Sequence, residues 1–193
     1  MDLVEKKRDE ELIFDGTLLK VRRTRVELPD GNEAVREWIN HPGASAVIPF
    51  FTGGETLLVK QFRYPLGRVT LEIPAGKLDP GESTLACAIR ELSEETGLVG
   101  GEFIKVGTVA TTPGFTNEVI HLYVCQDPST GAAHPDAEEF INCLRLPVTE
   151  VFARIADGRI QDGKTVTAFL LARFHGLLKT DLTTLASKIR PAG

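Results

Sequence analysis

The sequence is poor in cysteine, in basic residues and in long apolar runs, and each shortage excludes a class of protein. Of its 193 residues only three are cysteine, namely Cys87, Cys125 and Cys143. An odd number of thiols in apolar surroundings predicts reduced side chains in the cytoplasm rather than a disulfide framework. Lysine and arginine number 22 against 27 acids, and the formal net charge of -5 argues against a general nucleic-acid binder.

No stretch has the composition of a membrane-spanning or targeting segment. No apolar run reaches the eighteen or so residues that a membrane helix needs. The first eleven residues, MDLVEKKRDEE, are too charged for a signal peptide. The hydrophobic fraction of 42% and the charged fraction of 25% are ordinary for a globular protein. We therefore expect a cytoplasmic protein with one main domain and a small extension.

An antiparallel hairpin is predicted near the start of the chain. The segments TLLKVRRTRVEL (17–28) and NEAVREWI (32–39) flank the turn signal PDG. The stretch NHPGAS (40–45) has the composition of a hinge. We expect a small antiparallel β domain over 1–42 and a main domain over 43–193.

Strands and helices alternate through the main domain. Apolar and β-branched runs predict strands over 45–51, 56–64, 68–76, 103–113, 118–127 and 140–147. Helices are predicted over 83–96, 148–158 and 163–178. Because the alternation lacks strict βαβ regularity, we expect an α/β fold in which helices cover the faces of a mixed sheet.

The first predicted helix crowds carboxylates beside its apolar face. At 100° per residue, that face contains Leu85, Ala88, Ile89 and Leu92. Glu91, Glu94 and Glu95 fall on an adjoining arc, and Glu82 precedes the helix. Like charges at helical spacing repel by roughly 0.2–0.5 kcal/mol per exposed pair. The crowding therefore calls for a positive partner.

Two partners for these acids can be named from the sequence. Arg90 can pair with Glu94 or with Glu82, but one arginine cannot neutralise four acids. A hard divalent cation can, and Mg²⁺ commonly takes one or two carboxylates together with substrate phosphates. The lack of a histidine and cysteine cluster here disfavours zinc. The pattern indicates a magnesium site that binds phosphate groups.

The spacing of these residues matches a longer motif. It reads Gly76, five residues, Glu82, seven residues, then Arg90-Glu91-Leu92-x-Glu94-Glu95-x-Gly97-Leu98. This motif resembles the Nudix box with no departure. The resemblance implies a Nudix α/β/α sandwich and a hydrolase of pyrophosphates that join a nucleoside to another group. It also implies Mg²⁺ as the cofactor, with Mn²⁺ as a substitute.

The resemblance to the Nudix box assigns roles by position. Glu91 and Glu95 are expected to be the main metal ligands, together with the backbone carbonyl of Ala75. Glu94 is expected to be a further ligand or a base.

Three other acidic or basic side chains acquire expected roles in the same way. Arg90 and Glu82 are expected to complete the catalytic set by orienting the glutamates. Glu72, in LEIPAG, matches a recurrent acid of the nucleotide-sugar branch, and the resemblance gives it no definite role.

Features outside the box resemble the ADP-ribose pyrophosphatase and nucleoside diphosphate sugar hydrolase subfamily. Pro113 lies sixteen residues past Gly97, and VREWINHPGASAVIPF and VKQFRYPLG precede the box. This likeness implies a homodimer that exchanges its N-terminal β domain, with ADP-ribose as substrate. GDP-mannose, or a broad range of nucleoside diphosphate sugars, is the alternative. A non-catalytic ADP-ribose sensor is a second alternative.

Substrate-binding residues are expected in both parts of the chain. Arg36 and Arg63 suit phosphate binding or stacking on a base, and the alternative is a surface ion pair. Trp38 is expected to stack on adenine across the dimer or to pack in a core. The residues expected to line the terminal-ribose pocket are Gly114, Phe115 and Glu118.

The general base is expected outside the box. The subfamily likeness places it in a loop after the later strands, where HPDAEEF stands here. Glu139 is the first choice and Glu138 the second, with Asp136 as a further candidate. A glutamate in such a loop can close over substrate and exclude water until the reaction.

Overall fold

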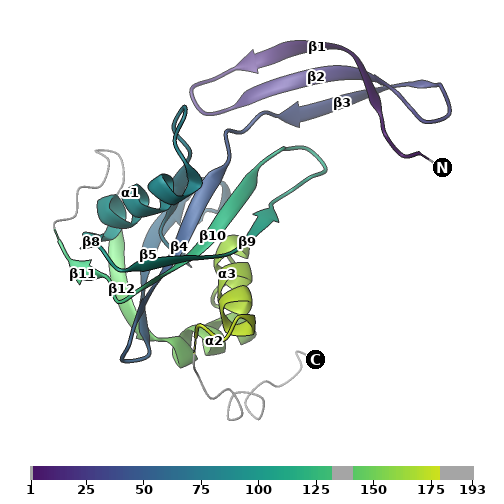
Figure 1. Ribbon diagram of the computed structural model, residues 1–193. Helices are drawn as coiled ribbons and strands as arrows, with labels where there is room; N and C mark the ends of the chain where they lie inside the picture. The colour runs from purple at the N-terminus through teal and green to yellow at the C-terminus, as the bar shows by residue number, and fades with distance from the viewer. Residues whose placement is uncertain (1, 132–140, 179–193) are drawn as a thin grey trace. The chain divides into compact units, whose positions relative to one another are not determined.

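The computed structural model describes residues 2–131 and 141–178, and the chain folds into two compact units (Figure 1). One unit comprises Met1–Gly43 together with Ala110–Val119, and the other comprises Ala44–Val109 together with Ile120–Gly193. The N-terminal unit thus includes Ala110–Val119, which the predicted division into 1–42 and 43–193 assigns to the main domain. In the described part of the chain, no helix is long and apolar enough to cross a membrane.

The N-terminal unit is built on a three-stranded antiparallel sheet in the order β1-β2-β3. Its strands are β1 (Lys6–Asp15), β2 (Lys20–Glu27) and β3 (Glu33–Ile39). The predicted hairpin corresponds to β2 and β3. The sequence did not predict β1, because its charged residues show no apolar alternation.

Cross-strand ion pairs explain why β1 forms. Arg25 on β2 donates to Asp9 on β1, with Nε 2.8 Å from Oδ2. Arg23 contacts Glu11 on one side and Glu37 on the other, at 3.2 and 2.9 Å. Opposite charges that face each other across strands stabilise the sheet where β1 is mostly charged.

The segment Ala110–Val119 is attached to the end of β3 by hydrogen bonds from and to the Ile39 backbone. The Ile39 amide donates to the Phe115 carbonyl at 2.8 Å, and the Thr116 hydroxyl donates to the Ile39 carbonyl at 3.1 Å. These bonds hold the loop TPGFTNE at one end of the small sheet.

The second unit is built on a seven-stranded mixed sheet. Its path runs β12-β5-β4-β10-β9, while β6 pairs with β5 and β7 pairs with β4. The strands are β4 (Ala44–Phe51), β5 (Glu55–Arg63), β6 (Arg68–Glu72), β7 (Ala75–Lys77), β9 (Glu102–Ala110), β10 (Val119–Gln126) and β12 (Asn142–Pro147). The β4–β10 pair is parallel and the β4–β5 pair antiparallel, which confirms the predicted mixed sheet. The short strands β8 (Leu98–Val99) and β11 (Ser129–Thr130) form a separate pair, and the 3₁₀ helix η1 (Tyr64–Leu66) joins β5 to β6.

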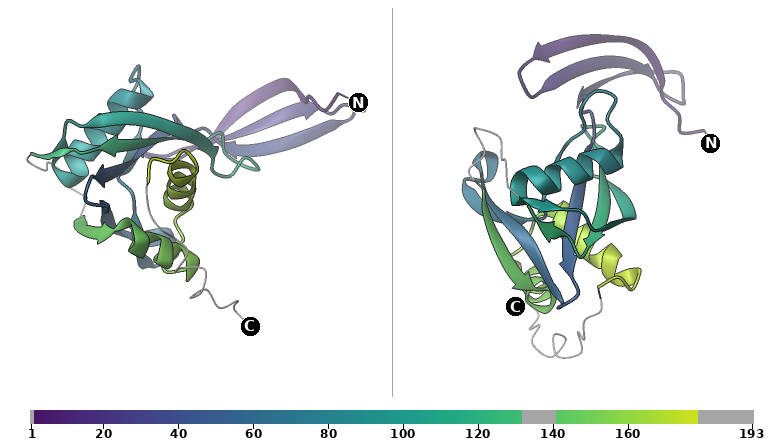
Figure 2. Two further views of the ribbon diagram at one scale, coloured as in Figure 1. Left: turned by 60° about the horizontal axis from the view of Figure 1, so that its bottom comes forward. Right: turned by 60° about the vertical axis from the view of Figure 1, so that its left-hand side comes forward.

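Helices cover both faces of this sheet (Figure 2). They are α1 (Thr84–Thr96), α2 (Val148–Ala156) and α3 (Gly163–Phe174). Ala46 and Ile48 of β4 pack in one cluster with Phe169 of α3, whereas Val47 packs in another with Leu92 of α1. Because alternate residues of a strand point to opposite faces, α1 covers one face, and α2 and α3 cover the other. The fold is the predicted three-layer α/β/α arrangement.

Helix α1 begins and ends where the sequence predicts, but its buried face is different. The Ser83 hydroxyl caps its start by accepting from the Ala86 amide, and Gly97 ends it in the left-handed conformation with φ 70°. The expected apolar face was wrong for Leu85 and Ile89, which are 41% and 45% exposed. The helix is rotated so that its buried residues are Cys87, Ala88, Leu92 and Glu95.

Candidate active site

The backbone segment before α1 is fixed by pairing with β4, an interior strand of the main sheet. Ala75 and Gly76 pair with Ala46 and Ser45 of β4. The Pro74 carbonyl accepts from the Val47 amide at 2.9 Å. These bonds hold the 74–76 backbone within the main sheet, which α1 covers on one face.

Gly76 leaves room for the carboxylate of Glu91. A Cβ atom built on residue 76 would lie 1.8 Å from Glu91 Oε1. Real Cβ atoms do not approach so closely, so only glycine at this position permits the observed packing. The Glu91 carboxylate therefore lies directly against the strand backbone.

Glu95 reaches the same backbone from one turn further along α1. It is only 6% exposed, and its Oε2 accepts a hydrogen bond from the Ala75 amide at 3.2 Å. The carboxylates of Glu91 and Glu95 thus converge on Ala75–Gly76. The sequence predicted partial shielding of Glu95, and its burial is almost complete.

Arg90 connects three of the four box glutamates. Its Nε and Nη2 donate to the two oxygens of Glu82, each at 2.9 Å. Its Nη1 donates to Glu91 at 2.7 Å and to Glu94 at 2.9 Å. The bonds to Glu82 raise the pKa of Arg90 above its ordinary value, and they lower the pKa of Glu82 to about 2. One guanidinium carries a single positive charge against the four box carboxylates, so the box residues together remain negatively charged.

The donors at this site fit a hard divalent cation. In the described part of the chain, no three side chains of His, Cys, Asp or Glu form a ready-made metal cluster. Two carboxylates, of Glu91 and Glu95, lie beside the backbone that bears the Ala75 carbonyl. A small set of oxygen donors, completed by water and phosphate oxygens, is the arrangement that Mg²⁺ prefers.

A second charged cluster lies at the end of β6, around Glu72. Arg63 donates to both of its carboxylate oxygens, at 2.8 and 2.7 Å, and the Thr70 hydroxyl donates at 2.5 Å. The Lys164 ammonium, from the first turn of α3, also contacts Glu72. Burial by itself would raise the pKa of Glu72, but the bonds from Arg63 and the charge of Lys164 outweigh it and lower the pKa to about 2.

A family model described as the NUDIX domain matches residues 39–169. The chain belongs to the Nudix family. Four of its glutamates and Arg90 occupy the Nudix box, and their geometry is that of the α1 site described above. The protein is therefore a Nudix hydrolase.

Named relatives of this Nudix hydrolase carry three different descriptions. A methanol dehydrogenase activator of Bacillus methanolicus is 41% identical over 171 residues, which cover 88% of this chain and 92% of that protein. An ADP-ribose pyrophosphatase of Bacillus subtilis is 36% identical over 168 residues, covering 86% and 91%. A GDP-mannose pyrophosphatase of Yersinia enterocolitica is 36% identical over 176 residues, covering 86% of each chain. Overall identity therefore does not select one substrate.

The fold also matches a solved structure. The crystal structure of an ADP compounds hydrolase superposes with a TM-score of 0.79 and covers 91% of this chain and 96% of that one. Its sequence identity is 21%, so the likeness concerns the fold.

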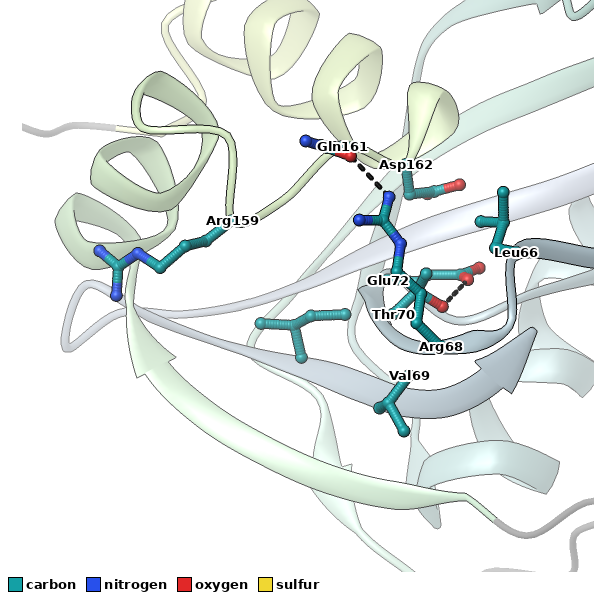
Figure 3. Close-up of a pocket in the computed structure, with 9 residues that line it drawn as sticks. Leu66, Arg68, Val69, Thr70, Glu72, Arg159, Gln161 and Asp162 are labelled. Atoms are coloured by element: carbon teal, nitrogen blue, oxygen red, sulfur yellow. Dashed lines mark hydrogen bonds between the residues drawn. The ribbon is translucent and has the colours of Figure 1, made fainter. Parts of the chain in front are cut away.

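A cavity of about 220 Å³ lies beside the Glu72 cluster (Figure 3). Its walls are formed by Leu66, Arg68, Val69, Thr70, Leu71, Glu72, Arg159, Gln161 and Asp162. Across it, Arg68 donates to the Gln161 side chain at 2.6 Å. Of the four box glutamates, all of which the structure describes, none lines this cavity. The cavity therefore adjoins the Glu72 cluster rather than the carboxylates on α1.

Sequence reasoning missed the part that Lys164 and Asp162 play beside Glu72. These residues lie 92 and 90 positions after it in the chain. One local signal was present, because a lysine in the first turn of a helix opposes the helix dipole. Such a placement indicates that a specific anion lies nearby.

Two of the predicted substrate residues lie on one face of the N-terminal sheet. Arg36 and Trp38 are two positions apart on β3, so their side chains point to the same side. Arg36 donates to Glu5 at 2.9 Å, and the Trp38 indole donates to the Thr24 hydroxyl at 3.0 Å. Both side chains are thus held by neighbours within their own unit.

Arg63 ends β5 in the cluster around Glu72, and the other three predicted substrate residues lie on the loop between β9 and β10. Phe115 is 52% exposed, and open space surrounds the position where Gly114 would carry a Cβ atom. Glu118 accepts a hydrogen bond from the Thr111 hydroxyl at 2.6 Å. The candidates for the general base, Glu139 and Glu138 with Asp136, lie outside the described residues.

Proposed function

We propose that this Nudix hydrolase cleaves the pyrophosphate bond of ADP-ribose with water, giving AMP and ribose 5-phosphate. The observation that carries the proposal is the convergence of the Glu91 and Glu95 carboxylates on the Ala75–Gly76 backbone. The choice of ADP-ribose is supported by Pro113 and by the relative named ADP-ribose pyrophosphatase in Bacillus subtilis.

Mg²⁺, with Mn²⁺ as a substitute, is the proposed cofactor. Glu91, Glu95 and the Ala75 carbonyl would hold it, with Glu94 as a further ligand. When bound, the cation supplies charge neutralisation for the diphosphate and for the attacking water. The protein's own contribution is positional, because Arg90 and Glu82 keep the ligand side chains in place before substrate arrives.

Substrate recognition is proposed to involve both units of the chain. Arg63 suits the diphosphate, and Arg36 with Trp38 suits the adenosine part. The loop with Gly114, Phe115 and Glu118 is proposed for the terminal ribose.

The assembly and the general base are also part of the proposal. We propose a cytoplasmic homodimer in which the β domain of residues 1–42 completes the site of residues 43–193 in the partner. Glu139 is proposed as the base that activates water, with Glu138 as the second choice.

A second candidate function keeps the chemistry and changes the sugar nucleotide. The relative named GDP-mannose pyrophosphatase in Yersinia enterocolitica is as similar, at 36% identity, as the Bacillus subtilis protein. Hydrolysis of GDP-mannose or of several nucleoside diphosphate sugars is therefore the alternative. A sensor that binds ADP-ribose without cleaving it is disfavoured, because every acid of the Nudix box is present.

The deciding experiment offers the protein ADP-ribose, GDP-mannose, UDP-glucose and NADH with and without Mg²⁺. We expect AMP from ADP-ribose only when metal is present. Glu95→Gln should lower turnover at least roughly tenfold, because loss of even the outer support of a metal ligand has that effect. Glu55→Gln, which breaks only the exposed pair with Arg145, is the matched control and should retain full activity.

The outcomes separate the candidates. Preferential turnover of GDP-mannose would keep the mechanism and replace the substrate. Tight binding of ADP-ribose without turnover of any compound would assign the protein to the sensors.

A further inference from the structure

Lys164 occupies an unfavourable position that the Nudix box does not explain. It lies in the first turn of α3, where the helix dipole opposes a positive charge. Its side chain is only 11% exposed, and a buried ammonium is unfavourable unless it is paired. Its partners are Glu72 and the helix cap Asp162, whose Oδ1 lies 3.1 Å from Nζ. The lysine is thus held between one strand end and its own helix cap.

Glu72 forms ion pairs with two basic side chains, Lys164 and Arg63. The Glu72 side chain is 3% exposed, and Arg63 binds it through Nε and Nη2 in a fork. Among the residues that the structure describes, Arg63 Nη1 has no hydrogen-bond partner. The Arg63 side chain is 41% exposed, so this last nitrogen is the one left for a ligand. Glu72 therefore sets the orientation of the guanidinium.

Arg63 lies within electrostatic reach of the α1 carboxylates. Its hydrogen bonds to Glu72 are the main reason why its pKa is raised, and the charge of Glu95 raises it further. Arg63 is thus close enough for the charge of Glu95 to act on it, although its hydrogen bonds are made to Glu72.

The same turn of α3 also holds the strand that leads to Ala75. The buried Thr165 hydroxyl accepts from the Ile73 amide at 2.9 Å and donates to Asp162 at 2.5 Å. Lys164 and Thr165 therefore bind the 72–73 segment at two adjacent points. One helix turn supports both Arg63 and the backbone of the proposed metal site.

We propose that Lys164 is a positioning residue for diphosphate binding, which acts through Glu72 to hold the Arg63 guanidinium with Nη1 toward the substrate. The inference rests on the proposed function, since it takes the ligand to be a nucleoside diphosphate. Lys164 itself does not touch the substrate. Its ammonium neutralises the negative charge of the Glu72 carboxylate by contacting Oε2. The carboxylate therefore stays buried, and the Arg63 guanidinium that it binds stays in one orientation.

A double-mutant cycle tests this coupling. Lys164→Met, Arg63→Ala and the double variant are compared with the unmodified protein on ADP-ribose and Mg²⁺. We expect Lys164→Met to raise KM about tenfold, with a smaller change in kcat, because the lost contact supports a binding residue. In the Arg63→Ala background the same change should alter KM less than about twofold, because residues that act through one another are not additive.

Two further variants separate positioning from general stability. Lys164→Arg keeps the charge and should restore most of the affinity, while Lys164→Gln replaces Lys164→Met if the latter does not fold. Arg154→Met breaks an ion pair with Glu150 on the neighbouring helix α2, with Nε 2.7 Å from Oε1. It is the matched control and should leave KM unchanged. Additive effects of the Lys164 and Arg63 changes would overturn the proposal.

Failure of the inference and failure of the proposed function are distinguishable. If the unmodified protein hydrolyses ADP-ribose but the effects of the Lys164 and Arg63 substitutions on KM are additive, the proposed function is retained and the proposed role of Lys164 is refuted. If ADP-ribose binds without turnover, the cycle is measured on its Kd by calorimetry, and non-additivity there still supports positioning. Absence of both turnover and binding would overturn both.

Discussion

The carboxylate of Glu91 occupies the space in which a side chain at position 76 would begin. A Cβ atom there would lie 1.8 Å from Glu91 Oε1 and 2.0 Å from its Cδ. Both atoms belong to the end of a flexible side chain, so an added methyl group would push the carboxylate away rather than break the sheet. The glycine that opens the Nudix box is therefore required by contact with one of the box glutamates.

Gly76→Ala is expected to lower activity without unfolding the protein. The displaced Glu91 would no longer converge with Glu95, so turnover should fall at least about tenfold, as for lost support of a metal ligand. Gly53→Ala, at a position with nothing within 4 Å of the new atom, is the control and should be fully active. Equal activity of the two variants would contradict the role assigned to the contact.

Glu72→Gln is expected to make the protein less stable in a pH-dependent manner. Because the pKa of Glu72 is lowered from 4.5 to about 2, its charge stabilises the fold fully above pH 4.5. This contribution is lost as the pH falls from 4.5 towards 2. At neutral pH it is worth on the order of 3 kcal/mol, since one pKa unit corresponds to about 1.4 kcal/mol.

Urea unfolding of the two proteins between pH 7 and pH 3 measures this contribution. The difference in the free energy of unfolding should be largest near neutral pH and should shrink below pH 4.5. Glu55→Gln, at an exposed ion pair, should change stability by less than about 1 kcal/mol. A Glu72→Gln difference that is constant with pH would show that the carboxylate charge is not the cause.

Arg90→Lys is expected to weaken metal binding. A lysine has no planar fork, so it cannot hold both oxygens of Glu82 and also contact Glu91 and Glu94. The Mg²⁺ concentration for half-maximal activity should rise roughly tenfold or more. Mg²⁺ should also raise the Tm of the unmodified protein more than that of the variant, because a ligand that binds only the folded state stabilises it. An unchanged metal requirement would contradict this account.

Thiol labelling is expected to distinguish Cys143 from the other two cysteines. Cys87 and Cys125 are buried, and burial raises their pKa to about 11 and about 12. Only Cys143 is exposed. Near pH 8, Ellman's reagent should therefore react with one thiol per chain in the folded protein and with three thiols per chain after denaturation. The Cys143→Ser variant should show no reactive thiol until it is unfolded. Rapid labelling of the folded variant would contradict the burial of Cys87 and Cys125.

The sequence by itself determined the local elements and the acids of the site. The caps Ser83 and Gly97 and the spacing of the box specify helix α1, because cap chemistry and helical periodicity act over a few residues. Turn signals and apolar runs specified most strands for the same reason. The identity of the Nudix box, and with it the α/β/α fold, followed from residues that lie within 23 positions of each other.

Only the tertiary structure decided which groups meet across the chain. It buried Glu95 and exposed Leu85 and Ile89, because the rotation of α1 depends on the sheet that it covers. It formed β1 from charged residues, because their partners lie on β2. It also brought Lys164 to Glu72, a contact between residues 92 positions apart. Such contacts depend on how strand ends and helix starts are stacked, and no local pattern of side chains contains that information.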